Sequence, residues 1–121
     1  MKNYINWFEI PATDFERAVK FYKTLFSCEI QEMELFGSQM GFLPSDGIHV
    51  TGAIVQGEDY KPSSNGTLIY LNGGEDLSNM LSLAEANGGE VIVPKTSIGE
   101  NGFMAQFKDT EGNRIAIHSM Q

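Results

Sequence analysis

The stretch IPATDFERAVKFYKTLF, residues 10–26, decides the fold of the first half of the chain. Thr13 and, three residues later, Glu16 form a capping-box pattern, which predicts that a helix begins here. The residues before it, Asn3 to Ile10, alternate as a strand does, and Pro11 is expected to end that strand. Apolar side chains then recur at helical spacing, at Phe15, Ala18, Val19, Tyr22, Leu25 and Phe26. The stretch therefore predicts a strand followed by an amphipathic helix that must bury one face.

The second half of the chain repeats this pattern. Three strand-like stretches follow the first helix, near Glu29–Phe36, Gln39–Leu43 and His49–Gln56. Residues 57–66 have no periodicity and are rich in turn-forming types, so we expect a connector there. We then expect a strand at Thr67–Asn72, a helix marked by Leu77, Met80, Leu81 and Ala84, and strands at Glu90–Ile98, Phe103–Lys108 and Arg114–Ser119. The order β-α-β-β-β thus occurs twice, with Asp14-Phe15 and Asp76-Leu77 opening the two helices.

The repeat predicts an α+β fold made of two β-α-β-β-β modules. We expect one domain over residues 1–121, with a first module over about 1–57 and a second over about 66–121. The helix of each module can cover only one face of its sheet. The two bare faces are therefore expected to cooperate, side by side or across a dimer, and to enclose a concave cavity lined by mixed sheets.

Two motifs, taken together with the repeat, resemble the vicinal oxygen chelate superfamily, which includes glyoxalase I, bleomycin-resistance proteins and extradiol dioxygenases. The late hairpin pattern Asp-Pro-Glu-Gly-Asn matches residues 109–113, with Thr110 in place of proline. The helix pattern Asp-aromatic-x-Arg-Ala-x-x-Phe-Tyr matches at Asp14, Phe15, Arg17, Ala18, Phe21 and Tyr22. The resemblance covers essentially the whole chain. It implies a glyoxalase-like fold, a small-molecule ligand and a homodimer, because the short members of the family usually assemble two chains.

The metal enzymes of this family hold a divalent ion with four side chains from the first and last strands of the two modules. The resemblance carries three of these positions onto Trp7, Thr67 and Ala116. The fourth falls in a strand where residues 50–55 contain no Asp, Glu, His or Cys. An indole and a methyl group are not ligands for a divalent ion. The resemblance therefore implies a pocket without the usual metal and without any other cofactor.

Four residues are candidates for contact with a ligand. Strand alternation places Glu9 on the same face as Trp7, and His118 on the pocket face of the last strand. The resemblance carries Thr67 onto the same pocket, with apolar Leu71 on its face. A pocket of this kind combines apolar walls, which supply affinity, with a few polar groups that orient a small molecule.

Three of these residues admit two interpretations each. Glu9, as a half-buried carboxylate in an apolar strand, is a candidate general base or else an ion-pairing residue at a pocket rim or dimer seam. His118 is either a proton shuttle or an exposed residue near the end of the chain. Trp7 stacks on a planar ligand or fills the space that a metal occupies in relatives.

The balance of charge excludes several partners. Eight Lys and Arg against sixteen Asp and Glu give a net charge of −8, which repels nucleic-acid phosphates and anionic lipid surfaces. No apolar run reaches the length of a membrane span, and the first residues do not resemble a cleavable leader, so we expect a cytoplasmic protein. The positions carried into the pocket include no Lys or Arg. We therefore expect a neutral or cationic ligand.

These observations lead to three functional hypotheses. The first is a metal-independent glyoxalase-like protein that binds a small organic molecule and, if it is an enzyme, uses Glu9 as general base in a lyase- or isomerase-type proton transfer. The second is a divalent-metal-dependent enzyme resembling lactoylglutathione lyase, in which Glu9, His118 and His49 rebuild a metal site. The third is a protein of the bleomycin-resistance kind that sequesters a drug or metabolite.

Overall fold

The computed structural model describes residues 3–121, which divide into two compact units after Pro62. This division falls inside the segment 57–66, which was expected to be a connector. Each unit contains one four-stranded mixed sheet and one α-helix. No helix among residues 3–121 has both the length and the apolar character needed to cross a lipid bilayer.

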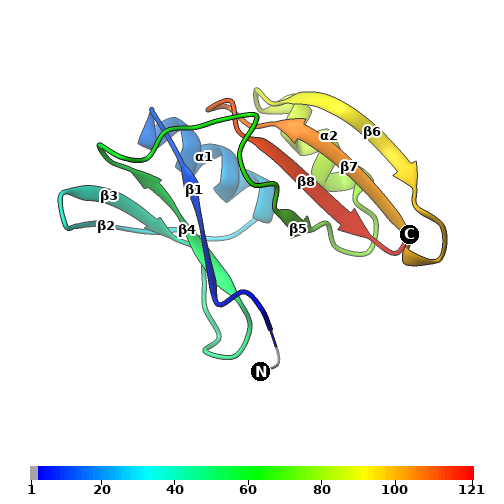
Figure 1. Cartoon of the computed structure of the whole chain (residues 1–121), viewed down its shortest axis with the longest axis horizontal. Helices are drawn as coiled ribbons and strands as arrows, with labels where there is room; N and C mark the ends of the chain where they lie inside the picture. Colours follow the sequence, from blue (N-terminus) through cyan, green and yellow to red (C-terminus); the bar gives the residue numbers. More distant parts are fainter. Residues whose placement is uncertain (1–2) are drawn as a thin grey trace. The chain divides into compact units, whose positions relative to one another are not determined.

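The first unit has the element order β-α-β-β-β. Its elements are β1 (Trp7–Pro11), α1 (Phe15–Phe26), β2 (Gln31–Leu35), β3 (Ser38–Phe42) and β4 (Thr51–Gln56). The strands are arranged in the order β1-β4-β3-β2, with β1 parallel to β4 and the other neighbours antiparallel. Helix α1 packs against β4 on one side of this sheet, as Figure 1 shows.

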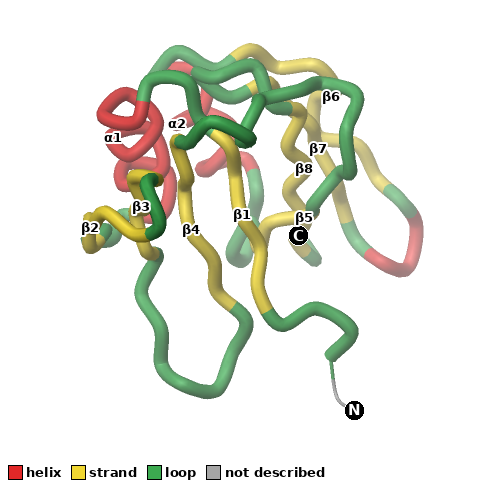
Figure 2. Tube along the Cα trace, turned by 60° about the vertical axis from the view of Figure 1, so that its left-hand side comes forward, coloured by secondary structure: helices red, strands yellow, loops and turns green. Residues whose placement is uncertain are grey.

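The second unit repeats this topology. Its elements are β5 (Tyr70–Asn72), α2 (Ser78–Ala86), β6 (Glu90–Ser97), a short 3-10 helix η1 (Gly99–Asn101), β7 (Phe103–Lys108) and β8 (Arg114–Ser119). The strand order is β5-β8-β7-β6, again with a parallel outer pair, β5 and β8. Helix α2 packs against β6 and β7, and Figure 2 shows both helices with the strands of their units. The predicted pair of β-α-β-β-β modules is thus confirmed.

Side-chain alternation divides each sheet into a helix-covered face and an open face. On β1, Ile10 is 1% exposed and its ladder partner Ile54 is fully buried, whereas Trp7 and Glu9 on the opposite face are exposed. On β8, Ile115 and Ile117 are buried, as Ile10 and Ile54 are in the first unit. The apolar core of each unit therefore lies between its sheet and its helix. The other face carries polar and aromatic residues together with the buried Ala53, Val55 and Ala116.

Helix α1 begins one residue later than the capping box predicts. Asp14, not Thr13, is the N-cap residue: its backbone is extended, and its carboxylate accepts a hydrogen bond from the backbone N–H of Arg17 at 3.2 Å. An Asp side chain at this position satisfies an N–H that has no partner inside the helix. The buried face also differs by one residue, because Phe21 is buried and Phe26 is only half-buried.

The hairpin between β7 and β8 is organised around a buried carboxylate. Asp109 is 4% exposed, and its side chain accepts hydrogen bonds from the backbone N–H groups of Glu111 and Asn113, both at 2.9 Å, and from the Asn113 amide at 3.0 Å. Gly112 has φ +94°, a conformation that favours glycine. The Asp-Thr-Glu-Gly-Asn motif is therefore a turn that aligns β8 with β7.

Several predicted strands are longer than the observed ones, and two of them were predicted to start three or more residues too early. The first strand begins at Trp7 rather than Asn3, because its ladder with β4 begins with the pair Trp7 and Thr51. The fifth strand begins at Tyr70 rather than Thr67, because its regular ladder with β8 begins with Tyr70 and Ala116. In both cases the alternating pattern of the sequence begins several residues before the first residue that pairs with a neighbouring strand.

Replacing Asp14 with alanine should lower the free energy of unfolding by about 1 kcal/mol, because it removes the acceptor that caps α1. Urea denaturation followed by circular dichroism measures this change. The Asp14→Asn variant is the control: it keeps a side-chain oxygen at the cap and should lose much less. Equal losses in the two variants would contradict a capping role.

Candidate functional site

The open face of the first unit carries an aromatic wall beside a pocket of about 520 Å³. Trp7 on β1 and Phe42 on β3 form this wall, with ring centroids 5.9 Å apart and ring planes tilted by 50°. Thr51, the ladder partner of Trp7, and Gln31, the ladder partner of Phe42, also line the pocket. Trp7 remains 41% exposed, so much of its indole surface is available to a ligand.

Glu9 lies on the same face as Trp7, as predicted, and its two carboxylate oxygens have different donors. The indole Nε1 of Trp7 donates to Oε2 at 3.3 Å, and the hydroxyl of Tyr60 donates to Oε1 at 2.8 Å. Donating this bond to a carboxylate raises the pKa of the Tyr60 phenol, since ionised Tyr60 would lose the bond and repel Glu9. Glu9 is exposed rather than half-buried, so the expectation of partial burial is wrong.

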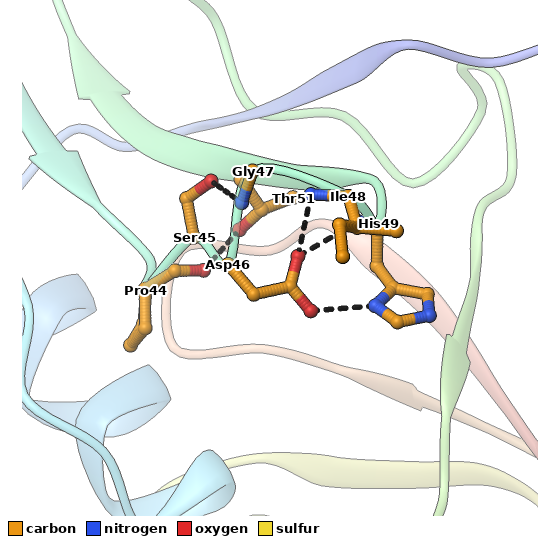
Figure 3. A network of polar contacts seen from close by, with 7 residues as sticks. All are labelled: Pro44, Ser45, Asp46, Gly47, Ile48, His49 and Thr51. Atoms are coloured by element: carbon orange, nitrogen blue, oxygen red, sulfur yellow. Dashed lines mark hydrogen bonds and ion pairs between the residues drawn. The ribbon is translucent and has the colours of Figure 1, made fainter.

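A network of side-chain and backbone hydrogen bonds closes the loop at the edge of this pocket (Figure 3). Oδ1 of Asp46 accepts from the backbone N–H groups of Ile48 and His49, both at 2.8 Å, while Oδ2 lies 2.5 Å from Nδ1 of His49. The hydroxyl of Thr51 donates to the carbonyl of Pro44 at 2.9 Å. Pro44 and Thr51 both line the pocket, so this network fixes part of its wall.

The second unit has its own pocket, of about 690 Å³, on the open face of its sheet. Its wall includes Tyr70, Asn72, Ile98, Asn101, Met104 and His118. Ladder pairing confirms that His118 shares a face with Ala116, because their partners Asn72 and Tyr70 alternate along β5. The Nε2 atom of His118 lies 2.6 Å from the carbonyl oxygen of Asn101. His118 is therefore a half-buried pocket residue with a defined partner.

The structure does not bring Thr67 to either pocket wall. Thr67 is exposed and precedes β5. Leu71, four residues further along the chain, pairs with Ile117 and is buried on the helix-covered face. Leu71 nevertheless belongs to the residues that line the pocket of the second unit. The side chains on the open face of β5 are those of Tyr70 and Asn72, which pair with Ala116 and His118.

Two cations lie on the open face of the second sheet. Arg114 lies on β8 at the alternation of His118, and its guanidinium donates to Oε1 of Gln106 at 2.8 Å and to the carbonyl of Ser64 at 3.3 Å. Lys108 is its ladder partner on β7. The walls of the two pockets nevertheless include no Lys or Arg from the described residues.

The residues present do not fit the metal site of the metal-dependent relatives. Trp7 and Ala116, which the resemblance places at two of the ligand positions, offer no lone pair that binds a divalent ion. Among residues 3–121, no three His, Cys, Asp or Glu side chains are grouped so that they could hold a metal ion. No step of a reaction is therefore assigned to a metal.

Sequence reasoning missed Tyr60 and Asn101, the loop residues that form hydrogen bonds with Glu9 and His118. Tyr60 lies in the segment predicted to be a connector, and Asn101 lies in the hairpin between two strands. Neither residue belongs to a periodic pattern that could predict its role. Each lies outside the strands, and the path of its loop brings it to its partner. Phe42 was identifiable in principle, since it alternates with Met40 on a predicted strand.

The comparisons with known proteins agree with this fold. A sequence model of the glyoxalase/bleomycin resistance protein/dioxygenase superfamily matches residues 4–117. A glyoxylase-like domain-containing protein from Didymella fabae is 33% identical over 124 residues, which cover 93% of this chain and 91% of the relative. The chain belongs to the glyoxalase/bleomycin resistance protein/dioxygenase superfamily, as the two motifs and the repeat indicated.

Solved structures of the superfamily share the fold at low identity. A glyoxalase/bleomycin resistance protein from Albidiferax ferrireducens T118 has a TM-score of 0.75 and 18% identity, covering 98% of this chain and all of that one. An antibiotic binding protein from Streptomyces sp. CB03234 has a TM-score of 0.71 and 20% identity, with 100% and 99% covered. A variant of glyoxalase I from Zea mays has a TM-score of 0.75 and 12% identity, and this chain spans 44% of its length.

The Asp46–His49 pair should make the pocket-edge loop sensitive to pH. The hydrogen bond from Asp46 raises the pKa of His49, and the same bond lowers the pKa of Asp46. Stabilisation from His49 is complete below about pH 6.5 and is lost as the pH rises through its raised pKa; that from Asp46 is complete above about pH 4 and is lost as the pH falls. The pair is therefore strongest between these limits.

An NMR titration of the two histidines checks this prediction. The Asp46→Asn variant should return the pKa of His49 toward its ordinary value, because an amide does not attract the imidazolium as a carboxylate does. The Asp59→Asn variant removes a charge from another loop of the same unit and should leave His49 unchanged. An unaltered His49 titration in Asp46→Asn would contradict the interaction.

Proposed function

We propose that this protein binds a small organic molecule on the open faces of its sheets and does so without the metal used by its metal-dependent relatives. The observation that carries the proposal is the wall formed by Trp7 and Phe42 beside a pocket that also contains polar groups. Aromatic side chains contribute large contact areas with little loss of conformational freedom. Thr51 and Gln31 add the hydrogen-bonding groups that orient a ligand.

The ligand is proposed to be neutral or cationic. This follows from the pocket walls, which include no Lys or Arg among the described residues, and from the Glu9 carboxylate beside Trp7. The net charge of −8 acts in the same direction. Arg114 and Lys108 lie elsewhere on the open face of the second sheet and do not line its pocket.

Glu9 is proposed to act on the ligand as a hydrogen-bond acceptor and, if a reaction occurs, as its general base. Trp7 and Tyr60 both donate to the carboxylate, so the local structure orients both of its oxygens. A base positioned by two donors suits a lyase- or isomerase-type proton transfer. Pure sequestration is the second candidate, favoured by the fold shared with an antibiotic binding protein.

A homodimer forms part of this proposal. Each four-stranded sheet has a helix on one face only, and the other face of the first unit exposes Trp7 and Met33, each about two-fifths exposed. Pairing of two chains would cover apolar surface of this kind. Sedimentation equilibrium measures the mass in solution, and a monomer at all concentrations would contradict the dimer.

The chain contains a single tryptophan, Trp7, so intrinsic fluorescence reports directly on the proposed site. Trp7→Phe should keep part of the aromatic wall, whereas Trp7→Ala should weaken the binding of a ligand found by fluorescence screening at least tenfold, measured by calorimetry. Glu9→Gln distinguishes the two roles. If Glu9→Gln loses turnover but still binds the ligand, the protein is an enzyme. If the wild type shows no turnover and Glu9→Gln binds the ligand with unchanged affinity, the result supports sequestration.

Metal analysis of the purified protein tests the metal-dependent alternative. Thermal melts with Zn²⁺, with Ni²⁺ and with EDTA should coincide if no site exists, because a ligand that binds the folded state raises the melting temperature. Glu85→Gln serves as the matched control, since Glu85 is an exposed carboxylate on α2 and is not one of the ligands of that alternative. Stoichiometric metal, with a melting shift that Glu9→Gln or His118→Gln removes, would establish a metal site and reject the proposal.

A further inference from the structure

The pocket of the second unit contains one titratable nitrogen whose role the hydrogen bonds define. His118 projects from β8 into the pocket wall, and its Nε2 lies 2.6 Å from the main-chain carbonyl oxygen of Asn101. A carbonyl oxygen can only accept a hydrogen bond, so Nε2 must carry the proton. In the neutral imidazole, Nδ1 then holds the lone pair and is an acceptor.

The loop that presents the Asn101 carbonyl is itself closely held. The backbone N–H of Ile98 donates to the carbonyl of Gly102 at 2.8 Å, and that of Gly102 donates to the carbonyl of Gly99 at 3.1 Å. Gly102 has φ +98°, and a Cβ there would lie 2.4 Å from the Ser119 carbonyl oxygen on β8. The loop thus packs against the end of β8 that carries His118. Because the Asn101 carbonyl is held in place, it keeps the proton of the imidazole on Nε2.

Apart from Asn101, no described residue among 3–121 forms a hydrogen bond with the imidazole of His118, so Nδ1 has no protein donor. The neighbours of His118 across the ladder, Asn72 on β5 and Met104 on β7, are uncharged. Ile98 and Tyr70 supply further apolar and aromatic surface to the same pocket. The wall is therefore apolar apart from Asn72, Asn101, the Tyr70 hydroxyl and the imidazole of His118.

We propose that this pocket selects neutral, planar, largely apolar molecules that carry a hydroxyl or N–H group, and that this group donates its hydrogen bond to Nδ1 of His118. The inference rests on the proposed small-molecule function and names the ligand class for the second unit. Donor selection follows because a ligand lacking the donor leaves the lone pair of Nδ1 without a partner once water is displaced. His118 is thus a specificity-determining residue.

Two probes that differ only in the donor test this inference: 2-naphthol, which carries a hydroxyl, and 2-methoxynaphthalene, in which a methyl group replaces the hydroxyl proton. NMR titration of labelled protein gives both affinities, and resonances of the second unit locate the site. We expect 2-naphthol to bind about five- to tenfold more tightly. Equal affinities, or no binding of either probe, would overturn the inference.

A matched pair of variants separates selection from structure. In His118→Gln the side-chain amide reaches the position of Nε2 and can donate to Asn101, but no acceptor remains at Nδ1. In His118→Asn the amide oxygen lies near the position of Nδ1, while the bond to Asn101 is lost. The ratio of the two probe affinities should fall to about one in His118→Gln and persist in His118→Asn, whereas a merely structural role would leave the ratio unchanged in both.

Long-range ¹H–¹⁵N correlation spectra test the tautomer without any ligand. The chain has only two histidines, and His49→Gln assigns their signals. We expect the Nε2–H tautomer for His118 at pH 8; an Nδ1–H tautomer would overturn the inference. These failures differ from failure of the proposed function, because a ligand that changes the fluorescence of Trp7 would still support binding at the first unit.

Discussion

Each sheet of this protein has a helix on one face only, and the sites depend on that constraint. Helices α1 and α2 bury the residues at one alternation of their strands, such as Ile10 and Ile54, in an apolar core. The other alternation keeps its side chains outside this core, so aromatic, carboxylate and imidazole groups can occupy it without the cost of burying them unpaired. The division between stability and recognition therefore follows the pleat of the sheet.

Loops then determine what the open faces can do. Tyr60 comes from the end of the first unit and donates to Glu9 on β1, while Asn101 comes from the β6–β7 connection and binds His118 on β8. In both cases a strand supplies the functional group and a loop supplies the partner that orients it. Within the loop beside the Trp7 pocket, Asp46 orients His49 through a hydrogen bond between their side chains. Preorganised partners of this kind reduce the cost of ordering a site on binding.

The duplicated topology has produced two different surfaces. The first unit presents an aromatic pair beside a carboxylate, and the second presents an imidazole among apolar side chains. The resemblance to metal-dependent relatives places Trp7 and Ala116 at two ligand positions, and neither side chain can bind a divalent ion. A fold does not specify a chemistry. The pocket walls of this chain combine apolar and aromatic surface with a few polar groups.

The sequence by itself determined the duplicated β-α-β-β-β order, the helix-facing residues and the placement of Glu9 beside Trp7, because hydrophobic periodicity and turn residues are local signals. It misplaced the cap of α1 by one residue and the start of β5 by three, since alternation does not state which residue pairs first with the neighbouring strand. Only the tertiary structure decided the partners of Glu9 and His118 and the position of Arg114 on the open face. These depend on strand register and on where loops return to the sheet, and both are set by contacts between residues far apart in the chain.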